Sequence, residues 1–312
     1  MAVAAAADRV TSGRARVSDA VELAYDVFGD GGRPLLLIMG IGAQRIFWDE
    51  SMCKQLVTAG FHVARFDHRD IGESSRLDMP VPKPGRALAL RMLGVVPAPP
   101  YTLSDMARDV ATLIGTLGWS SAHVVGASMG GMVGQQLAVE HPEVVRSLTS
   151  IMSTPGGRRY LPKPFALKAL FMPPPKTAEE AGISVDNLFR TIGGYAWPHD
   201  SGRLQALGRV AHARGASPKG FLRHFAAIMG TADRRGALRE SRVPTLVIHG
   251  TSDPLIPPSA GRATARLIPG ATWLPISGMG HGLPSAVWPT VVAAIARHAE
   301  RADARATVYV AP

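Results

Sequence analysis

The sequence predicts an α/β fold in which helices cover both faces of a mostly parallel sheet. Short apolar runs alternate along the chain with longer amphipathic stretches, and this order of strands and helices is typical of parallel sheets. Most of the runs are apolar at every position, as strands are when both of their faces are buried. The six predicted strands lie at 35–39, 62–66, 123–127, 148–152, 245–249 and 273–276.

The length and composition suit one large domain of this class or two smaller ones. The chain has 312 residues, of which 46% are hydrophobic and 19% are charged. This balance excludes a disordered chain and a fibrous repeat. Cys53 is the single cysteine, so an intrachain disulfide and a cysteine-based zinc site are both excluded.

The remaining elements of the predicted core follow from the same periodicities. Segments at 14–17 and 21–27 flank a polar turn and predict an antiparallel hairpin at one edge of the sheet. Amphipathic patterns with helical spacing predict four helices that pack on the sheet. These helices lie at 49–59, 103–117, 129–140 and 286–302.

The regular alternation stops after Pro155 and resumes at Pro244, which predicts an insertion in the sheet. We expect residues 155–242 to form a helical cap over the carboxyl ends of the strands, between core segments 1–154 and 243–312. Prolines and glycines divide this segment, so its helical pieces are expected to be short, as at 186–192 and 221–229. A proline-rich loop at 79–100 is expected to border the same mouth.

Most of the positive charge lies in the insertion. The formal net charge is +10, and residues 158–242 carry 15 Lys and Arg against six Asp and Glu. Such a segment can attract nucleic acid, an anionic membrane or an acidic substrate, although a solvated arginine-rich surface is the simpler interpretation. No basic run studded with aromatic residues is present, so no nucleic-acid partner is predicted. Contact with a membrane surface stays open but is not favoured.

No targeting segment is expected. Residues 1–7 are apolar, but no basic region precedes them and Asp8 follows too early for a signal peptide. The stretch at 119–139 has no charged residue and is long enough to span a bilayer. It contains four glycines, however, and is interpreted as a strand, a turn and a helix. We therefore predict a cytoplasmic protein.

The pentapeptide Gly126-Ala127-Ser128-Met129-Gly130 matches the pattern G-x-S-x-G. It lies between a predicted strand and an uncharged helix, and such a strand-to-helix turn exposes a serine hydroxyl above the sheet. The outer glycines give room where the chain folds back on itself. Ser128 is therefore the candidate nucleophile, and the alternative is an ordinary helix N-cap.

A serine hydroxyl needs a base, and the base needs an acid that orients it. On this kind of turn the partners follow in the order serine, acid, histidine, each after a later strand. Asp253 follows the strand at 245–249, and His281 follows the strand at 273–276. Alone, Asp253 also fits a turn and His281 a structural histidine. Their order and positions together predict a catalytic triad.

Two backbone N–H groups are expected to stabilise the oxyanion of the reaction. One is that of Met129, at the start of the helix that follows the nucleophile. The other is that of Ile41, in the loop after the first predicted strand, where Gly40 and Gly42 leave its orientation free. No side chain is needed for this role, because both donors belong to the main chain.

Three further motifs, Met39-Gly40, DHRDIGES at 67–74 and GMGHGLP at 278–284, accompany GASMG. With them the chain resembles the α/β-hydrolases over nearly its whole length. Within that family it is similar to the anthracycline methylesterases and related bacterial esterases and lipases. Many relatives carry His-Gly where this chain has Met39-Gly40, a departure that concerns only side-chain support of the loop. Residues 67–74 are expected to brace the loops below the site, and His249 to pack at the end of a strand.

The predicted function is carboxylic-ester hydrolysis through an acyl-enzyme on this triad. A mostly apolar mouth near Ile46, Phe47 and Trp48 implies small to medium acyl or aromatic esters, and no metal or organic cofactor is implied. Thioester, lactone and carbon–carbon bond hydrolysis and peracid formation use the same triad and stay as alternatives. A ligand receptor without turnover is a further alternative. Epoxide hydrolysis and dehalogenation are disfavoured, because both use a carboxylate at position 128.

Overall fold

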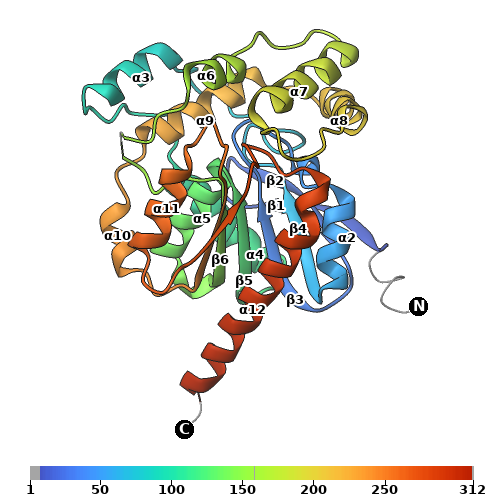
Figure 1. The fold of residues 1–312 in the computed structure, drawn as a ribbon, viewed down its shortest axis with the longest axis vertical. Helices are drawn as coiled ribbons and strands as arrows, with labels where there is room; N and C mark the ends of the chain where they lie inside the picture. The colour runs from blue at the N-terminus through green and yellow to red at the C-terminus, as the bar shows by residue number, and fades with distance from the viewer. Residues whose placement is uncertain (1–7, 158, 311–312) are drawn as a thin grey trace.

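The computed structural model describes residues 8–157 and 159–310 and has the predicted fold class, a mostly parallel sheet between layers of helices (Figure 1). The expectation for residues 1–7 lies outside the described residues, as does Arg158 of the basic insertion. Eight strands form one sheet in the order β1-β2-β4-β3-β5-β6-β7-β8. Their bounds are β1 (Val10–Arg16), β2 (Glu22–Phe28), β3 (Arg33–Ile38), β4 (Phe61–Phe66), β5 (Ala122–Ala127), β6 (Val145–Ile151), β7 (Thr245–Gly250) and β8 (Thr272–Ile276).

All of the predicted strands are present, and the hairpin lies at the edge of the sheet. β2 pairs antiparallel with both β1 and β4, whereas the other neighbouring strands pair parallel. β1 is longer than predicted, whereas β2 has the predicted seven residues and begins one residue later. β6 shows the largest shift among the central strands, since it begins at Val145 rather than at residue 148.

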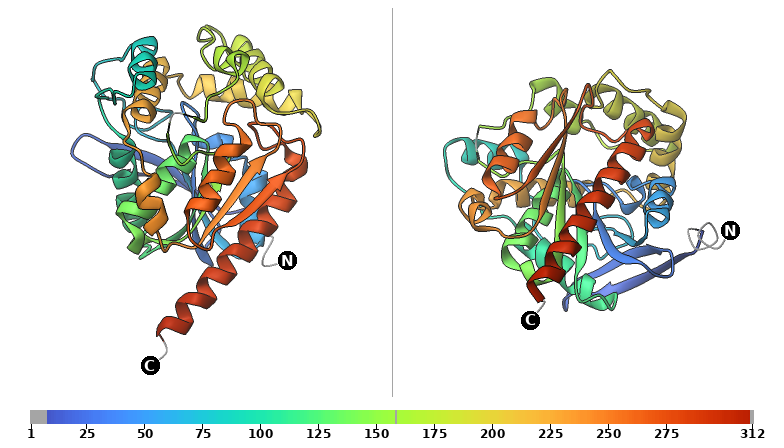
Figure 2. Two further views of the ribbon diagram at one scale, coloured as in Figure 1. Left: turned by 60° about the vertical axis from the view of Figure 1, so that its left-hand side comes forward. Right: turned by 60° about the horizontal axis from the view of Figure 1, so that its bottom comes forward.

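Helices cover both faces of the sheet and give the protein two core layers (Figure 2). On one face lie α2 (Glu50–Thr58) and α12 (Trp288–Val310), and on the other lie α4 (Leu103–Thr116), α5 (Met129–Glu140) and α11 (Pro258–Leu267). In β3, Leu35 and Leu37 pack in the α2–α12 layer and Leu36 and Ile38 in the α4–α5 layer. Alternate residues of one strand thus enter different layers, which explains why the runs are apolar throughout.

The described residues of the insertion between β6 and β7 form five helices, α6 (Pro164–Leu170), α7 (Ala178–Ile192), α8 (Ser201–Ala213), α9 (Pro218–Gly230) and α10 (Arg235–Glu240). In Figure 1, α6 to α9 lie across the upper end of the sheet, where the parallel strands end. α10 instead packs against α5 and α11 beside the sheet. The division into core and cap at residues 155 and 242 stays a prediction.

Short 3₁₀ helices lie outside the insertion: η1 (Arg45–Phe47), η2 (Pro142–Val144) and η3 (Ser285–Val287).

The prediction of short helices in the insertion holds for α6 and α10 but is wrong for α7, α8 and α9. Residues 186–192 are only the end of the 15-residue helix α7, and α8 was not predicted at all. The reason is that two glycines, which suggest helix breaks, are contact points here. A Cβ atom at Gly182 would meet the carbonyl oxygen of Gln205, and one at Gly208 would meet that of Ala181. The glycines therefore let α7 and α8 pack closely.

The expectation for the loop at 79–100 is also wrong. Its middle forms the helix α3 (Pro84–Met92), which begins with proline in the first turn and packs on α9. Proline at this position is compatible with a helix, because its missing N–H has no partner there. None of the residues at 79–100 lines the cavity around Ser128. The segment covers the outside of the insertion instead.

Arginines of the insertion fasten its helices to the core. Arg223 of α9 donates two hydrogen bonds to Asp70, at 2.8 and 2.9 Å, and Arg214 lies 3.0 Å from Asp67. Both aspartates are fully buried. Asp67 and Asp70 belong to the segment 67–74, which therefore joins the core to α8 and α9. This part of the basic block is internal rather than a solvated surface.

Among the described residues, no helix combines the length and the apolar character needed to cross a lipid bilayer.

Candidate active site

Ser128 lies on a sharp turn between the end of β5 at Ala127 and the start of α5 at Met129. Its backbone has φ 56° and ψ −119°, a conformation that non-glycine residues rarely adopt and that is typical of strained functional positions. A Cβ atom at Gly126 would overlap the carbonyl of Gly130, and one at Gly130 would overlap that of Ile38. The two glycines are therefore required by the close approach of the chain, and the predicted strand, turn and helix are present.

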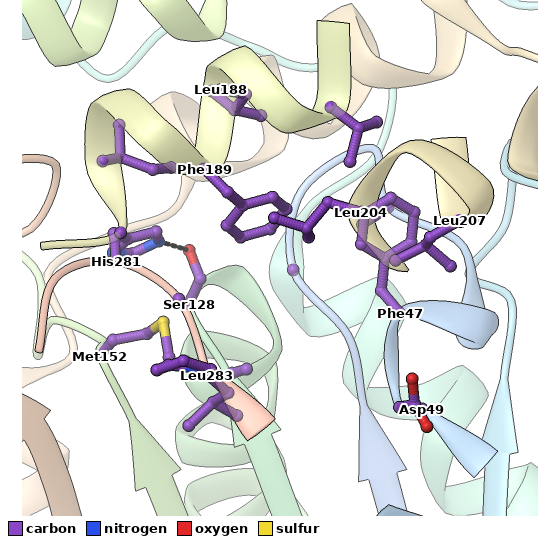
Figure 3. Close-up of a pocket in the computed structure, with 18 of the residues that line it drawn as sticks. Phe47, Asp49, Ser128, Met152, Leu188, Phe189, Leu204, Leu207, His281 and Leu283 are labelled. Carbon is purple, nitrogen blue, oxygen red and sulfur yellow. Dashed lines mark hydrogen bonds between the residues drawn. The ribbon is translucent and has the colours of Figure 1, made fainter. Parts of the chain in front are cut away.

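The structure brings the three predicted residues together above the carboxyl ends of the strands. Asp253 lies three residues after β7 and His281 five residues after β8. His281 Nδ1 is 2.7 Å from Asp253 Oδ2, and His281 Nε2 is 2.9 Å from Ser128 Oγ. Figure 3 shows the second of these contacts at the wall of a cavity. The side chains form a continuous chain of hydrogen bonds from acid to serine.

The surroundings of Asp253 determine the direction of these bonds. Its Oδ1 accepts the backbone N–H groups of Leu255 and Ile256, both at 2.9 Å, which leaves Oδ2 for His281. Burial acts to raise the pKa of Asp253, but the interaction with the imidazole of His281 and the hydrogen bonds from His249 and His281 outweigh it and lower this pKa to about 2. A carboxylate can only accept, so Nδ1 of His281 donates and Nε2 accepts the hydroxyl of Ser128.

His249, at the end of β7, supports the loop that carries the acid. Its Nε2 donates to the carbonyl oxygen of Ile256 at 2.9 Å and lies 3.4 Å from Asp253 Oδ2. The imidazole is fully buried. It therefore packs at a strand end, as expected, and also lies beside the carboxylate oxygen that faces His281.

The two predicted backbone donors flank the serine. Met129 is the first residue of α5, and Ile41 follows β3 in a loop that passes beside Ser128, because a Cβ atom at Gly40 would lie 3.3 Å from that of Ser128. Within the part of the chain that the structure describes, neither N–H group donates to an acceptor. Ile41 lines the cavity, whereas Met129 lies buried directly after the serine.

Two buried histidines that the sequence analysis did not single out hold the loop that contains Ile41. Nε2 of His68 donates to the carbonyl oxygen of Met39 at 3.0 Å, and the N–H of Gly42 donates to Nδ1 of His224 at 3.3 Å. Nε2 of His224 donates in turn to the carbonyl oxygen of Arg69 at 2.9 Å. Burial lowers the pKa of His68 to about 3 and that of His224 to about 4, so both imidazoles are neutral.

These histidines supply the side-chain support that Met39 cannot give. His224 belongs to α9, so the insertion itself reaches the loop. Nothing in its sequence surroundings marks this histidine, because its two partners lie more than 150 residues away along the chain. His68 lies inside the motif at 67–74, so the sequence motif could have identified it.

The candidate site opens into a cavity of about 400 Å³ with mostly apolar walls. α7 and α8 form its upper wall, opposite Ser128 and His281 (Figure 3). Phe47 and Trp48 line it as expected, whereas Ile46 does not. The large apolar side chains around it are Met39, Ile41, Phe47, Trp48, Met52, Met152, Leu170, Val185, Leu188, Phe189, Ile192, Trp197, Leu204, Leu207, Phe221, Leu255, Leu283 and Trp288.

Comparison with known proteins agrees with this geometry. Residues 33–284 match the family model described as alpha/beta hydrolase fold. The rhodomycin D methylesterase DnrP of Streptomyces peucetius is 30% identical over 311 residues, covering 91% of this chain and 97% of that protein. The resemblance to α/β-hydrolases and to anthracycline methylesterases is thus confirmed.

Solved structures match the fold as well. An enol-lactonase from Burkholderia xenovorans LB400 is similar with a TM-score of 0.69 at 23% identity, covering 92% of this chain and 99% of that one. A thermophilic esterase from Thermogutta terrifontis is similar with a TM-score of 0.68 at 24% identity, covering 94% and 99%. At these identities the likeness concerns the fold alone. The family match, which spans most of the chain, carries the assignment: the protein belongs to the α/β hydrolase fold family.

Proposed function

We propose that the protein is a serine carboxylic-ester hydrolase that works through an acyl-enzyme. The observation that carries the proposal is the chain of hydrogen bonds from Asp253 through His281 to Ser128, which ends in a mostly apolar cavity. The named methylesterase activity of the relative at 30% identity supports hydrolysis of an ester bond. The size and apolar walls of the cavity favour small to medium acyl or aromatic esters.

Acylation begins when Ser128 Oγ attacks the carbonyl carbon of the ester. His281 takes the hydroxyl proton on Nε2, and Asp253 stabilises the resulting imidazolium. The negative charge that develops on the carbonyl oxygen is stabilised by the N–H groups of Ile41 and Met129. When the tetrahedral intermediate collapses, the carbon–oxygen bond to the alcohol breaks. The alcohol leaves with the proton from His281, and the acyl group stays on Ser128.

Deacylation repeats these steps with water as the nucleophile. His281 Nε2 takes a proton from water, and the hydroxide attacks the acyl carbon. The same two N–H groups stabilise the second intermediate, which collapses to release the carboxylic acid and return the proton to Ser128. The balance of the reaction is one ester and one water converted to one acid and one alcohol. Every step uses side chains, backbone groups and water.

The proposal extends to the insertion, residues 155–242, as a cap that shapes the substrate site. Leu188 and Phe189 of α7 and Leu204 and Leu207 of α8 face the serine across the cavity (Figure 3). Phe189 lies near Phe47 of the core, with ring centroids 6.4 Å apart. An acyl or aromatic group attached to Ser128 would therefore be enclosed between the core and these helices.

Turnover of graded substrates tests the proposed activity. We expect p-nitrophenyl esters of short to medium acyl chains to be hydrolysed over many turnovers, with a decline once the acyl group exceeds the cavity. Matched thioesters, lactones and a carbon–carbon bond substrate form the comparison set. A kcat/KM at least a hundredfold higher for one of these would replace the ester assignment. Stoichiometric binding without turnover of any substrate would identify a receptor.

The hydrogen bonds of His224 to the loop that contains Ile41 lead to a further prediction. His224→Leu removes the acceptor for Gly42 and the donor to Arg69, so we expect kcat for ester hydrolysis to fall about tenfold with little change in KM. The loss is smaller than removal of an oxyanion donor, because the N–H of Ile41 remains. His224→Asn keeps an acceptor near Nδ1 and is expected to retain most of kcat. Steady-state kinetics of both variants check this, and a change in KM alone would contradict the loop's role in the transition state.

A further inference from the structure

Exposed large apolar side chains gather on two segments at the outside of the molecule. Met92, Leu93, Val95 and Val96 follow one another at and after the end of α3, and Leu93 is 78% exposed. Leu161 and Phe165 lie before and at the start of α6, and both are at least half exposed. Large apolar side chains on a protein surface are normally scattered singly, so their concentration here points to an interaction surface.

The chain beside each segment lies near the end of α9 or the start of α10. Gly230, at the end of α9, approaches Pro97 and Pro99, which follow the first segment, and Gly157, just before the second, approaches the guanidinium of Arg235 in α10. In Figure 1, α3 and α6 lie at the same end of the molecule, above α9. The two segments therefore lie on the outside of the same end of the molecule. We call residues 81–96 and 159–172 the apolar–basic surface.

The charge of this surface has a single sign. Residues 79–104 and 145–178 contain no Asp and no Glu. Lys83, Arg86, Arg159, Lys163 and Lys168 are exposed, and within residues 8–157 and 159–310 none of them has an acidic partner. Arg203 of α8 and Arg223 of α9 differ in this respect, since they pair with Asp49 and Asp70 of the core. Cations that the fold does not use thus surround the exposed apolar side chains.

We propose that the apolar–basic surface docks onto an anionic lipid bilayer. Apolar side chains on such a face enter the boundary between headgroups and acyl chains, while Lys and Arg bind the anionic headgroups. A nucleic acid or acidic peptide would engage the cations but leave Leu93 and Phe165 exposed. A second copy would place like charges against each other. A bilayer with anionic lipid satisfies both features of the surface.

The apolar–basic surface lies close to the cavity around Ser128, and this proximity has a consequence for substrate access that rests on the proposed function. A second apolar cavity of about 460 Å³ lies beside Met172 and Pro173, at the edge of the apolar–basic surface. It shares Phe47 and Phe221 in its walls with the cavity around Ser128. Docking would therefore place an amphiphilic ester in the membrane next to an apolar path toward the serine.

Sedimentation of the full chain with vesicles tests the docking directly. The vesicles contain phosphatidylcholine alone or phosphatidylcholine mixed with phosphatidylglycerol. We expect at least tenfold tighter binding to the anionic vesicles, weakened by salt. Two double variants change the surface, Lys163→Glu with Lys168→Glu and Leu93→Ser with Phe165→Ser. Each is expected to lose about tenfold or more in affinity, and circular dichroism verifies that each is folded.

Matched variants elsewhere serve as controls. Arg262→Glu with Arg266→Glu makes the same charge change on the exposed side of α11, and Val210→Ser removes an exposed apolar side chain from α8. Both are expected to bind within about twofold of the wild type. Ser128→Ala is also expected to bind normally, so docking can be judged even if the proposed ester hydrolysis fails.

Three results would overturn the proposal. The first is equal binding to neutral and anionic vesicles, or none to either. The second is a loss of binding in the Lys163/Lys168 variant together with unchanged binding in the Leu93/Phe165 variant, which would indicate a soluble polyanion as the partner. The third is a dimer of the wild type that the Leu93/Phe165 variant dissociates, without vesicle binding, which would make the face an interface between two copies.

Discussion

Replacement of Ser128 by alanine is expected to lower kcat for ester hydrolysis by about 10⁴- to 10⁶-fold, because the acyl group then has no oxygen to bind. His281 and Asp253 act only through this hydroxyl, so the remaining triad cannot compensate. The change removes one oxygen atom at a turn whose backbone stays the same. We therefore expect the variant to keep its circular dichroism spectrum and its thermal unfolding midpoint within a few degrees.

A serine at the opposite wall of the same cavity provides the control. Ser184 of α7 lines the cavity but makes no contact with the triad that the structure shows. Ser184→Ala is expected to retain kcat within about threefold, since a small polar change there touches no reacting group. Near-full activity of Ser128→Ala would reject Ser128 as the nucleophile, whatever the control shows.

Asp253→Asn is expected to lower kcat by about 10⁴-fold while leaving the loop in place. The Asn oxygen can keep the two bonds from the backbone N–H groups of Leu255 and Ile256. Its amide then turns an NH₂ group toward His281 Nδ1, which must become an acceptor. The proton of the neutral imidazole moves to Nε2, where the hydroxyl of Ser128 needs a free lone pair. The tautomer is wrong for proton transfer, and the base is lost.

Another aspartate at the cavity tests whether the effect is specific. Asp200 caps the start of α8 through a bond from the N–H of Arg203, and Asn is an equally good cap. Asp200→Asn is expected to keep kcat within about threefold. Comparable losses in both variants would point to a general effect of charge on the cavity and would contradict the assigned role of Asp253.

The core and the candidate triad could be predicted from the sequence because both depend on local patterns. Buried parallel strands are apolar throughout, so the last residue of each apolar run in the sequence marks the carboxyl end of a strand. Ser128, Asp253 and His281 all lie within five residues of such an end. Parallel strands bring their carboxyl ends to one edge of the sheet, so short segments far apart in the chain meet there. Strand boundaries and chain order were sufficient to place these residues together.

The insertion could not be predicted in the same way, because its order comes from contacts between distant segments. α7 and α8 depend on glycines that approach the neighbouring helix. α11, which the sequence analysis also missed, buries only the small residues Ala260, Gly261 and Thr264, so no large apolar side chain marks its buried face. The support of the Ile41 loop by His224 has no local sequence pattern at all.

Covalent labelling tests the central claim most directly. An aryl phosphonate that mimics an ester transfers its phosphonyl group to an activated serine, and the mass of the intact protein counts the groups attached. We expect one adduct per chain, located on Ser128 by peptide mapping, with loss of activity in proportion to labelling. We also expect Asp253→Asn to react at a much lower rate. Loss of activity with the adduct on any other residue, or full activity with Ser128 labelled, would contradict the account.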